Sequence, residues 1–164
     1  MRRVQFAAAL LLLVALAGCA YSLRAGRLRQ GLEVVAVPYL ENRSSEPEIE
    51  IQLTEAIIAG LIRDRTLRVA DESRADALVL GTIREYRFRE VFFGGDRQAE
   101  EYEITIAVEV EVIDRATRES MVGPRTVTGK GSYLLDVSGG EEAARQEAVG
   151  EIVEGILNLV IEEW

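Results

Sequence analysis

The strictest alternation of apolar and polar residues runs from Glu101 to Ile113. Mostly acidic or small residues lie between the apolar positions. The apolar positions are Tyr102, Ile104, Ile106, Val108, Val110 and Val112. A period of two predicts a strand with one buried and one exposed face. Less regular runs predict strands over Ala77–Phe93 and Met121–Leu135. Gly123-Pro124 interrupts the last one, and we expect a bulge or a sheet edge at this point.

Apolar residues at a spacing of three to four predict two helices. The first begins with Ser45 as its N-cap and Pro47 in its first turn, and it ends near Asp64. Its apolar face consists of Ile49, Leu53, Ile57 and Leu61. The second covers Glu141–Glu163, and its acidic start suits a helix N-terminus. Its apolar stripe is Ala148, Ile152, Ile156, Leu159 and Val160.

Two shorter apolar runs, Glu33–Leu40 and Leu67–Ala70, predict a strand on either side of the first helix. The element order is then β-α-β-β-β-β-α. Each helix has one apolar stripe, and the alternating strand has one apolar face. The fold class that satisfies all three is α+β: a two-layer sandwich in which two helices cover one face of a mixed sheet of four to five strands.

The N-terminus has the layout of a secretory leader. Arg2 and Arg3 precede a short apolar run, and Leu16-Ala17-Gly18-Cys19 follows it. The run is too short to span a bilayer, which takes about 20 residues. Leu-Ala-Gly-Cys resembles the bacterial lipoprotein box, so we expect residues 1–18 to be a signal peptide and Cys19 to be lipidated. Residues 19–32 would form a tether, and residues 33–164 a single domain.

Composition excludes several classes of function. Removal of the leader lowers the net charge from −9 to −11, which argues against general nucleic-acid binding. The chain has no histidine, so Ser-His-Asp and Cys-His catalytic arrangements are excluded in their usual form. The glutamates of Glu101–Ile113 follow the alternation of an exposed strand face and show no metal-ligand spacing. We therefore expect no enzymatic activity, no metal and no cofactor.

Several segments resemble the LptE-type lipopolysaccharide-assembly lipoproteins. Cys19-Ala20-Tyr21-Ser22-Leu23 is similar to the family's mature start, although Ala20 stands where glycine is usual. The run from Val35 to Ser44 resembles its strand-to-loop segment, and Glu46-Pro47 its helix opening. Ala75-Asp76-Ala77-Leu78-Val79-Leu80-Gly81 is similar to a strand motif of the family. The resemblance covers residues 19–133 and includes a matching terminal helix.

The resemblance implies a protein tethered to the periplasmic face of the cell outer membrane. Its partners would be an LptD-type β-barrel, whose lumen it occupies, and lipopolysaccharide, whose insertion it assists. Ala20 is not the aspartate that commonly signals inner-membrane retention. Similar motifs occur in lipoproteins that activate peptidoglycan synthases and in curli-type secretion lipoproteins. These remain the alternative function. The tether contains no proline and spans at most about 40 Å, which favours a partner close to the membrane.

Five basic residues on or next to the long strands are candidate contacts for lipopolysaccharide or the partner: Arg84, Arg87, Arg89, Arg97 and Lys130. A hairpin symmetric about Gly95 would place Arg87 opposite Glu103 and Arg89 opposite Glu101, with Phe88 opposite Tyr102. Cross-strand ion pairs on a solvated face are the favoured interpretation. The alternative is a basic strip that binds phosphates through the planar guanidinium fork.

Arg84 is the exception to the strand pattern. Strict alternation over Ala77–Phe93 places Arg84 on the apolar face, together with Leu78, Leu80, Tyr86 and Phe88. We favour a bulge near Ile83 that turns Arg84 outward. Without a bulge, Arg84 would be a partly buried cation that needs a partner.

Overall fold

The computed structural model describes residues 33–91, 101–134 and 138–162. The strands are β1 (Val34–Ala36), β2 (Glu41–Asn42), β3 (Arg68–Val69), β4 (Ala77–Val91), β5 (Glu101–Asp114) and β6 (Ser120–Tyr133). The helices are α2 (Ile49–Asp64), the short 3-10 helix η2 (Glu72–Arg74) and α3 (Gly140–Glu162).

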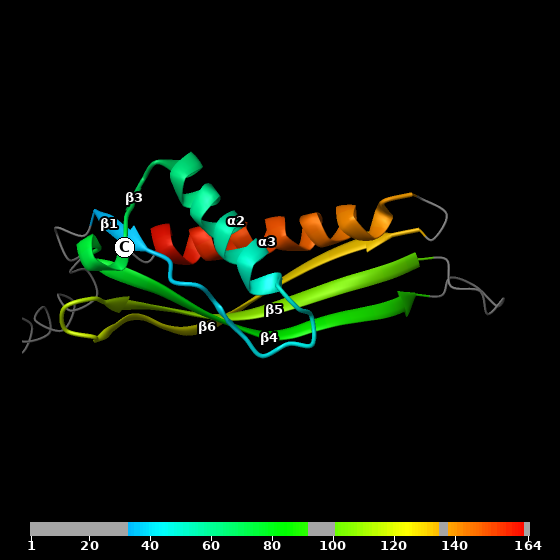
Figure 1. Ribbon diagram of the computed structural model, residues 1–164, viewed down its shortest axis with the longest axis horizontal. Helices are drawn as coiled ribbons and strands as arrows, with labels where there is room; N and C mark the ends of the chain where they lie inside the picture. Colours follow the sequence, from blue (N-terminus) through cyan, green and yellow to red (C-terminus); the bar gives the residue numbers. More distant parts are fainter. Residues whose placement is uncertain (1–32, 92–100, 135–137, 163–164) are drawn as a thin grey trace, which may run out of the picture. The chain divides into compact units, whose positions relative to one another are not determined.

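The described strands form one mixed sheet of six strands with the order β3-β1-β4-β5-β6, and β2 also pairs with β4. β1 runs parallel to β3 and β4, whereas β4, β5 and β6 form an antiparallel meander. Both helices lie on one face of the sheet (Figure 1). The predicted two-layer α+β fold is confirmed, with one strand more than expected. The extra strand arises because the segment expected over Glu33–Leu40 stops at Ala36, and pairing with β4 resumes at Glu41.

The first helix begins later than the sequence predicts. Its N-cap is Glu48 in a left-handed conformation, with φ of 62°, so the predicted cap at Ser45 is wrong. Asn42 organises the intervening loop instead, because its amide donates to the backbone oxygen of Glu46 and to the carboxylate of Glu50. The amide of Ser44 in turn donates to Asn42 Oδ1 over 2.9 Å. The predicted end of the helix at Asp64 is confirmed.

The main core lies between the sheet and the two helices. It contains the predicted apolar face of α2 and the even-numbered apolar residues of β5, together with Ala148, Ile152, Ile156 and Val160 of α3. A second, smaller cluster lies on the other face of the sheet and consists of Ala36, Ala75, Leu78 and Ile113, with Leu80 packed against it. That other face, away from α2 and α3, is called the open face below.

A register shift between Ile83 and Glu85 divides β4 into two halves. Before the shift, Val79 and Ile83 point to the helices and Leu78 belongs to the open-face cluster. After it, the even-numbered Tyr86 packs against the main core. The expectation that Leu78 and Leu80 share a face with Tyr86 and Phe88 is therefore wrong, because the inserted residue reverses the alternation.

β6 is an edge strand and is irregular where Gly123-Pro124 predicts it. Its pairing with β5 shifts between Val110 and Val112, opposite the segment from Val122 to Arg125. Proline cannot donate to a ladder, so an edge or a bulge is where it is tolerated. The prediction of a bulge or edge at this position is confirmed.

Candidate functional site

Four of the five predicted basic residues lie on the open face of β4, β5 and β6, among carboxylates. We call this group the charged face and define it by Arg84, Glu85, Arg87, Arg89, Glu103, Glu109 and Lys130. The alternation that buries the even-numbered residues of β5 under the helices puts Glu103 and Glu109 on this side. The fifth residue, Arg97, lies outside the described residues, as does Cys19.

Arg84 occupies the bulge of β4 and is exposed. Its guanidinium donates a hydrogen bond of 2.6 Å to Glu109, and both side chains are about two-fifths exposed. The favoured expectation of a bulge that turns Arg84 outward is confirmed by the register. The bulge removes a cation from the core side, where it would otherwise have needed a buried partner.

The hairpin between β4 and β5 pairs two residues away from the predicted register. Arg89 lies opposite Glu103, Arg87 opposite Thr105, and Val91 opposite Glu101. The expected Arg87–Glu103 and Arg89–Glu101 pairs are therefore wrong. Phe88 and Tyr102 are not directly opposite either, but their rings stack diagonally with centroids 4.9 Å apart. The symmetry centre could not be fixed from the sequence, because Gly94-Gly95-Asp96 permits more than one turn.

Glu103 is the most connected carboxylate of the charged face. It accepts from Arg89 at 2.9 Å and from Lys130 at 3.5 Å, so it joins β4 to β6 across β5. Desolvation raises the pKa of Glu103, but the charges of Lys130 and Arg89 outweigh it, and the pKa lies below its usual value. Glu103 is ionised at neutral pH and neutralises part of the charge of two candidate cations.

Arg87 binds Glu85 of its own strand through two guanidinium nitrogens. Each of the four described candidate cations therefore has a carboxylate partner. A guanidinium carries five N–H donors, and the ion pairs of Arg84 and Arg89 use one each. The charged face can thus still bind anionic or acceptor groups, but in competition with its own carboxylates, and as a mixed surface rather than a basic strip.

Sequence reasoning missed Arg145 of α3, which lies between two carboxylates and an aromatic ring. Its guanidinium contacts Glu46 and Glu141, each at 3.2 Å, and lies 5.8 Å from the ring centre of Tyr86. Burial raises the pKa of Tyr86, and the charge of Arg145 only partly offsets this effect. This group ties the loop before α2 to α3 and β4. The stripe pattern of α3 contains no signal for such a distant pair.

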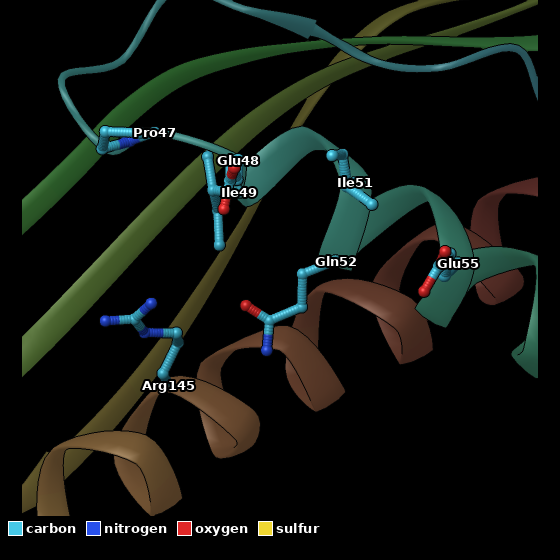
Figure 2. Close-up of a pocket in the computed structure, with 7 residues that line it drawn as sticks. All are labelled: Pro47, Glu48, Ile49, Ile51, Gln52, Glu55 and Arg145. Carbon is cyan, nitrogen blue, oxygen red and sulfur yellow. The ribbon is translucent and has the colours of Figure 1, made fainter.

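A recess of about 330 Å³ lies between the start of α2 and α3 (Figure 2). Pro47, Glu48, Ile49, Ile51, Gln52, Glu55 and Arg145 line it. Figure 2 shows Gln52 extending from α2 and Arg145 from α3 into the space between the two helices. The Nε atom of Arg145 is buried and has no hydrogen-bond partner within the described residues. The size is at the lower end for a small-molecule site, and the wall mixes carboxylates with isoleucines.

The described residues contain no group of three or more histidine, cysteine or acidic side chains that could hold a metal ion. In the same part of the chain, no helix has the length and apolarity needed to cross a membrane.

Solved structures with the same fold come from several bacteria. A protein from Xanthomonas campestris is 11% identical with a TM-score of 0.62, over 80% of this chain and 85% of that one. A hypothetical protein from Chlamydia trachomatis is 15% identical with a TM-score of 0.57, over 80% and 99% of the two chains. A minor lipoprotein from Acinetobacter baumannii is 15% identical with a TM-score of 0.55, over 79% and 92%. At these identities the similarity shows a shared fold.

No curated protein matches the sequence. The match that identifies the chain is a family model described as lipopolysaccharide-assembly, LptE, which covers residues 32–160. This range includes every described strand and nearly all of α3. The chain therefore belongs to the LptE family of lipopolysaccharide-assembly proteins.

Proposed function

We propose that this protein is a lipid-anchored accessory subunit of the outer-membrane lipopolysaccharide translocon. It braces or plugs an LptD-type β-barrel and assists the insertion of lipopolysaccharide. The observation that carries the proposal is the family match over residues 32–160, which assigns the chain to lipopolysaccharide assembly. The finer role of subunit and brace goes beyond that assignment and rests on the arguments below.

The anchor is the lipidated thiol of Cys19, after removal of residues 1–18. Several acyl chains give stable attachment, because each buried methylene contributes about 0.8 kcal/mol. Residues 19–32 form the tether, and residues 33–164 are the functional domain. In this proposal the protein lies at the periplasmic face of the outer membrane, held there by its acyl chains.

The charged face is the surface proposed to meet the barrel or lipopolysaccharide. The lumen of a large β-barrel is polar, so a surface inside it must be polar and must keep its charges balanced. Arg84, Arg87, Arg89 and Lys130 satisfy this condition because a carboxylate accompanies each. The same cations, with Arg97, are the proposed contacts for phosphate or acidic sugar groups, whose oxygens accept from free guanidinium N–H donors.

Depletion of the protein in its native cell tests this function. We expect newly made lipopolysaccharide to stop reaching the cell surface, while incorporation of cell-wall precursors continues. We also expect the tagged protein to co-purify with an outer-membrane barrel in mild detergent. A cell-wall synthesis defect with normal lipopolysaccharide export would instead support the peptidoglycan-synthase alternative.

Variants separate the anchor from the contact surface. Cys19→Ser should abolish lipidation, which mass spectrometry of the mature N-terminus measures directly. Combined replacement of Arg84, Arg89 and Lys130 by glutamine should weaken co-purification of the barrel or of lipopolysaccharide. Arg125→Gln removes one exposed cation from β6 outside the charged face and serves as the control.

A further inference from the structure

The two long edges of the described sheet differ in how they are protected against pairing with another chain. The edge of β6 carries Pro124, Gly129 and Gly131. In addition, the carboxylate of Glu151 in α3 accepts a hydrogen bond of 2.8 Å from the backbone amide of Lys130. Proline, glycine and a covering helix are devices that blunt a strand edge. The β6 edge is therefore poorly suited to receive a further strand.

The other edge is the outer side of β4, and only its first half is covered. β1 pairs with β4 at Ala77 and Leu78, and β2 pairs at Thr82 and Ile83. The amide of Arg43 then donates to the carbonyl of Ile83 over 3.0 Å. Beyond this point, no strand of the described residues pairs with Glu85–Val91 on the side away from β5. This stretch, the β4 edge, is extended and held by β5, so its outward backbone groups form a ready template.

Side chains of the β4 edge define which strand it would accept. Arg87 and Arg89 project on the open face and remain 57% and 60% exposed despite their ion pairs. Tyr86 and Phe88 project on the helix side, where Phe88 is 48% exposed and stacks on Tyr102. On the open face a neighbouring strand thus meets two arginines, with Glu85 before them at the start of the edge. On the helix side it meets the two aromatic rings, with Glu90 after them.

We propose that the β4 edge binds an extended segment of a partner protein in which acidic residues alternate with apolar residues. The segment adds as a further strand beside Glu85–Val91. Its backbone supplies the ladder hydrogen bonds, its carboxylates contact Arg87 and Arg89, and its apolar side chains cover Tyr86 and Phe88. Opposite charges across strands stabilise pairing, and like charges destabilise it. This inference concerns one edge and holds whether or not the protein serves the translocon.

Charge argues against two other occupants. The chain's own segment before the domain carries Arg24, Arg27 and Arg29, which would place cations beside Arg87 and Arg89. A second copy of β4 in antiparallel pairing around Phe88 would set Arg87 against Arg89 twice. An acidic, apolar-alternating strand avoids each of these repulsions.

The test uses the full lipidated protein in detergent micelles and a synthetic peptide, acetyl-Thr-Glu-Val-Glu-Val-Glu-Thr-amide, up to millimolar concentration. Amide hydrogen exchange should slow in Glu85–Val91 and not along the edge of β6. A matched peptide with lysine in place of glutamate should bind about tenfold more weakly, since several cross-strand charge pairs are lost. Arg87→Glu together with Arg89→Glu should cause a similar loss, whereas Arg125→Glu should leave binding unchanged.

Three results would overturn the inference: unchanged exchange in Glu85–Val91 at the highest peptide concentration, equal binding of the two peptides, or protection of this segment by self-association without peptide. If the unmodified protein does not bind the peptide although its depletion stops lipopolysaccharide export, the strand site alone is refuted. Normal peptide binding in a protein whose depletion leaves export intact would refute the translocon role alone.

Discussion

A β-carbon on Gly131 would lie 1.9 Å from the carbonyl oxygen of Ala144, a distance that non-bonded atoms do not reach. One helical turn further along α3, the same construction on Gly129 comes within 2.0 Å of the carbonyl oxygen of Ala148. The backbone of α3 thus rests directly on that of β6. The two glycines set this separation, and the buried face of α3 depends on it.

Gly131→Ala should lower the free energy of unfolding by about 3 kcal/mol, the upper range for overpacked cores, because the clash is with backbone that cannot rotate away. Urea denaturation followed by circular dichroism measures the change. Gly123→Ala is the matched control on the same strand, since no atom lies within 4 Å of its added β-carbon. Equal losses in the two variants would contradict the proposed contact.

Gly150→Ala should raise the free energy of unfolding, in contrast to Gly131→Ala. Gly150 lies inside α3 and is exposed, and its added β-carbon would meet open space. Alanine reduces the conformational freedom of the unfolded chain, so we expect a gain of about 0.4–1 kcal/mol. A thermal or urea unfolding curve shows the shift. Destabilisation would mean that this turn of α3 is covered in the folded protein.

The sequence predicted the elements whose signal is local and repeated. The alternation of Glu101–Ile113 fixed both the strand and its buried face, and the stripe of Leu53, Ile57 and Leu61 fixed the inner face of α2. Such patterns work because a period of two or of 3.6 maps directly onto one face of an element. Where one residue breaks the period, as at Arg84, only the presence of a bulge could be inferred, and residues on its two sides were wrongly assigned to the same face.

Contacts between distant segments had no such signal. Glu46 and Arg145 meet although most of the domain separates them along the chain. Gly129 and Gly131 carry no such signal either, because a glycine in a strand does not reveal which backbone approaches it. The hairpin register was missed by two residues, which moved every predicted ion pair while preserving the mixed charge of the surface.

Asp76 has a structural role in the segment Ala75–Gly81, which resembles a strand motif of the LptE family. Its Oδ2 accepts the backbone amides of Glu33 at 3.1 Å and Val34 at 3.0 Å, which positions the start of β1 beside β4. Asp76→Ala should destabilise the domain by about 1–2 kcal/mol, because hydrogen bonds to a charged acceptor are lost. Asp76→Asn retains one acceptor oxygen and should lose less. Hydrogen exchange at the two amides reports the local effect, and unchanged exchange in Asp76→Ala would argue against this role.

Tyr86 should make stability fall at alkaline pH. Burial raises its pKa above the ordinary value of 10.0, so the folded state holds the phenol proton more tightly than the unfolded state does. The resulting stabilisation is complete below about pH 10 and is lost as the pH rises through the folded-state pKa. Tyr86→Phe should therefore lose less stability than the unmodified protein when the pH rises from about 9 to about 11. Urea unfolding curves recorded at several pH values in this range measure the difference. Tyr39→Phe, at a tyrosine that is 71% exposed, is the control and should leave the alkaline slope unchanged.

Glu103 should produce the opposite dependence at acidic pH. Desolvation raises its pKa, but the charges and hydrogen bonds of Lys130 and Arg89 lower it by a larger amount. The folded-state pKa therefore lies below the ordinary value of 4.5. The folded state then binds the carboxyl proton less tightly than the unfolded state. This contribution is present above about pH 4.5 and disappears as the pH falls through the folded-state pKa.

Glu103→Gln should accordingly flatten the loss of stability between neutral and acidic pH. Glu111→Gln on the same face of β5 is the matched control, because the described residues give Glu111 no ion pair. Salt should weaken the effect of Glu103→Gln, since exposed charge pairs are screened. If the two variants show the same pH profile, the ion pairs of Glu103 contribute nothing to stability, and the charged face must then be maintained by the strands alone.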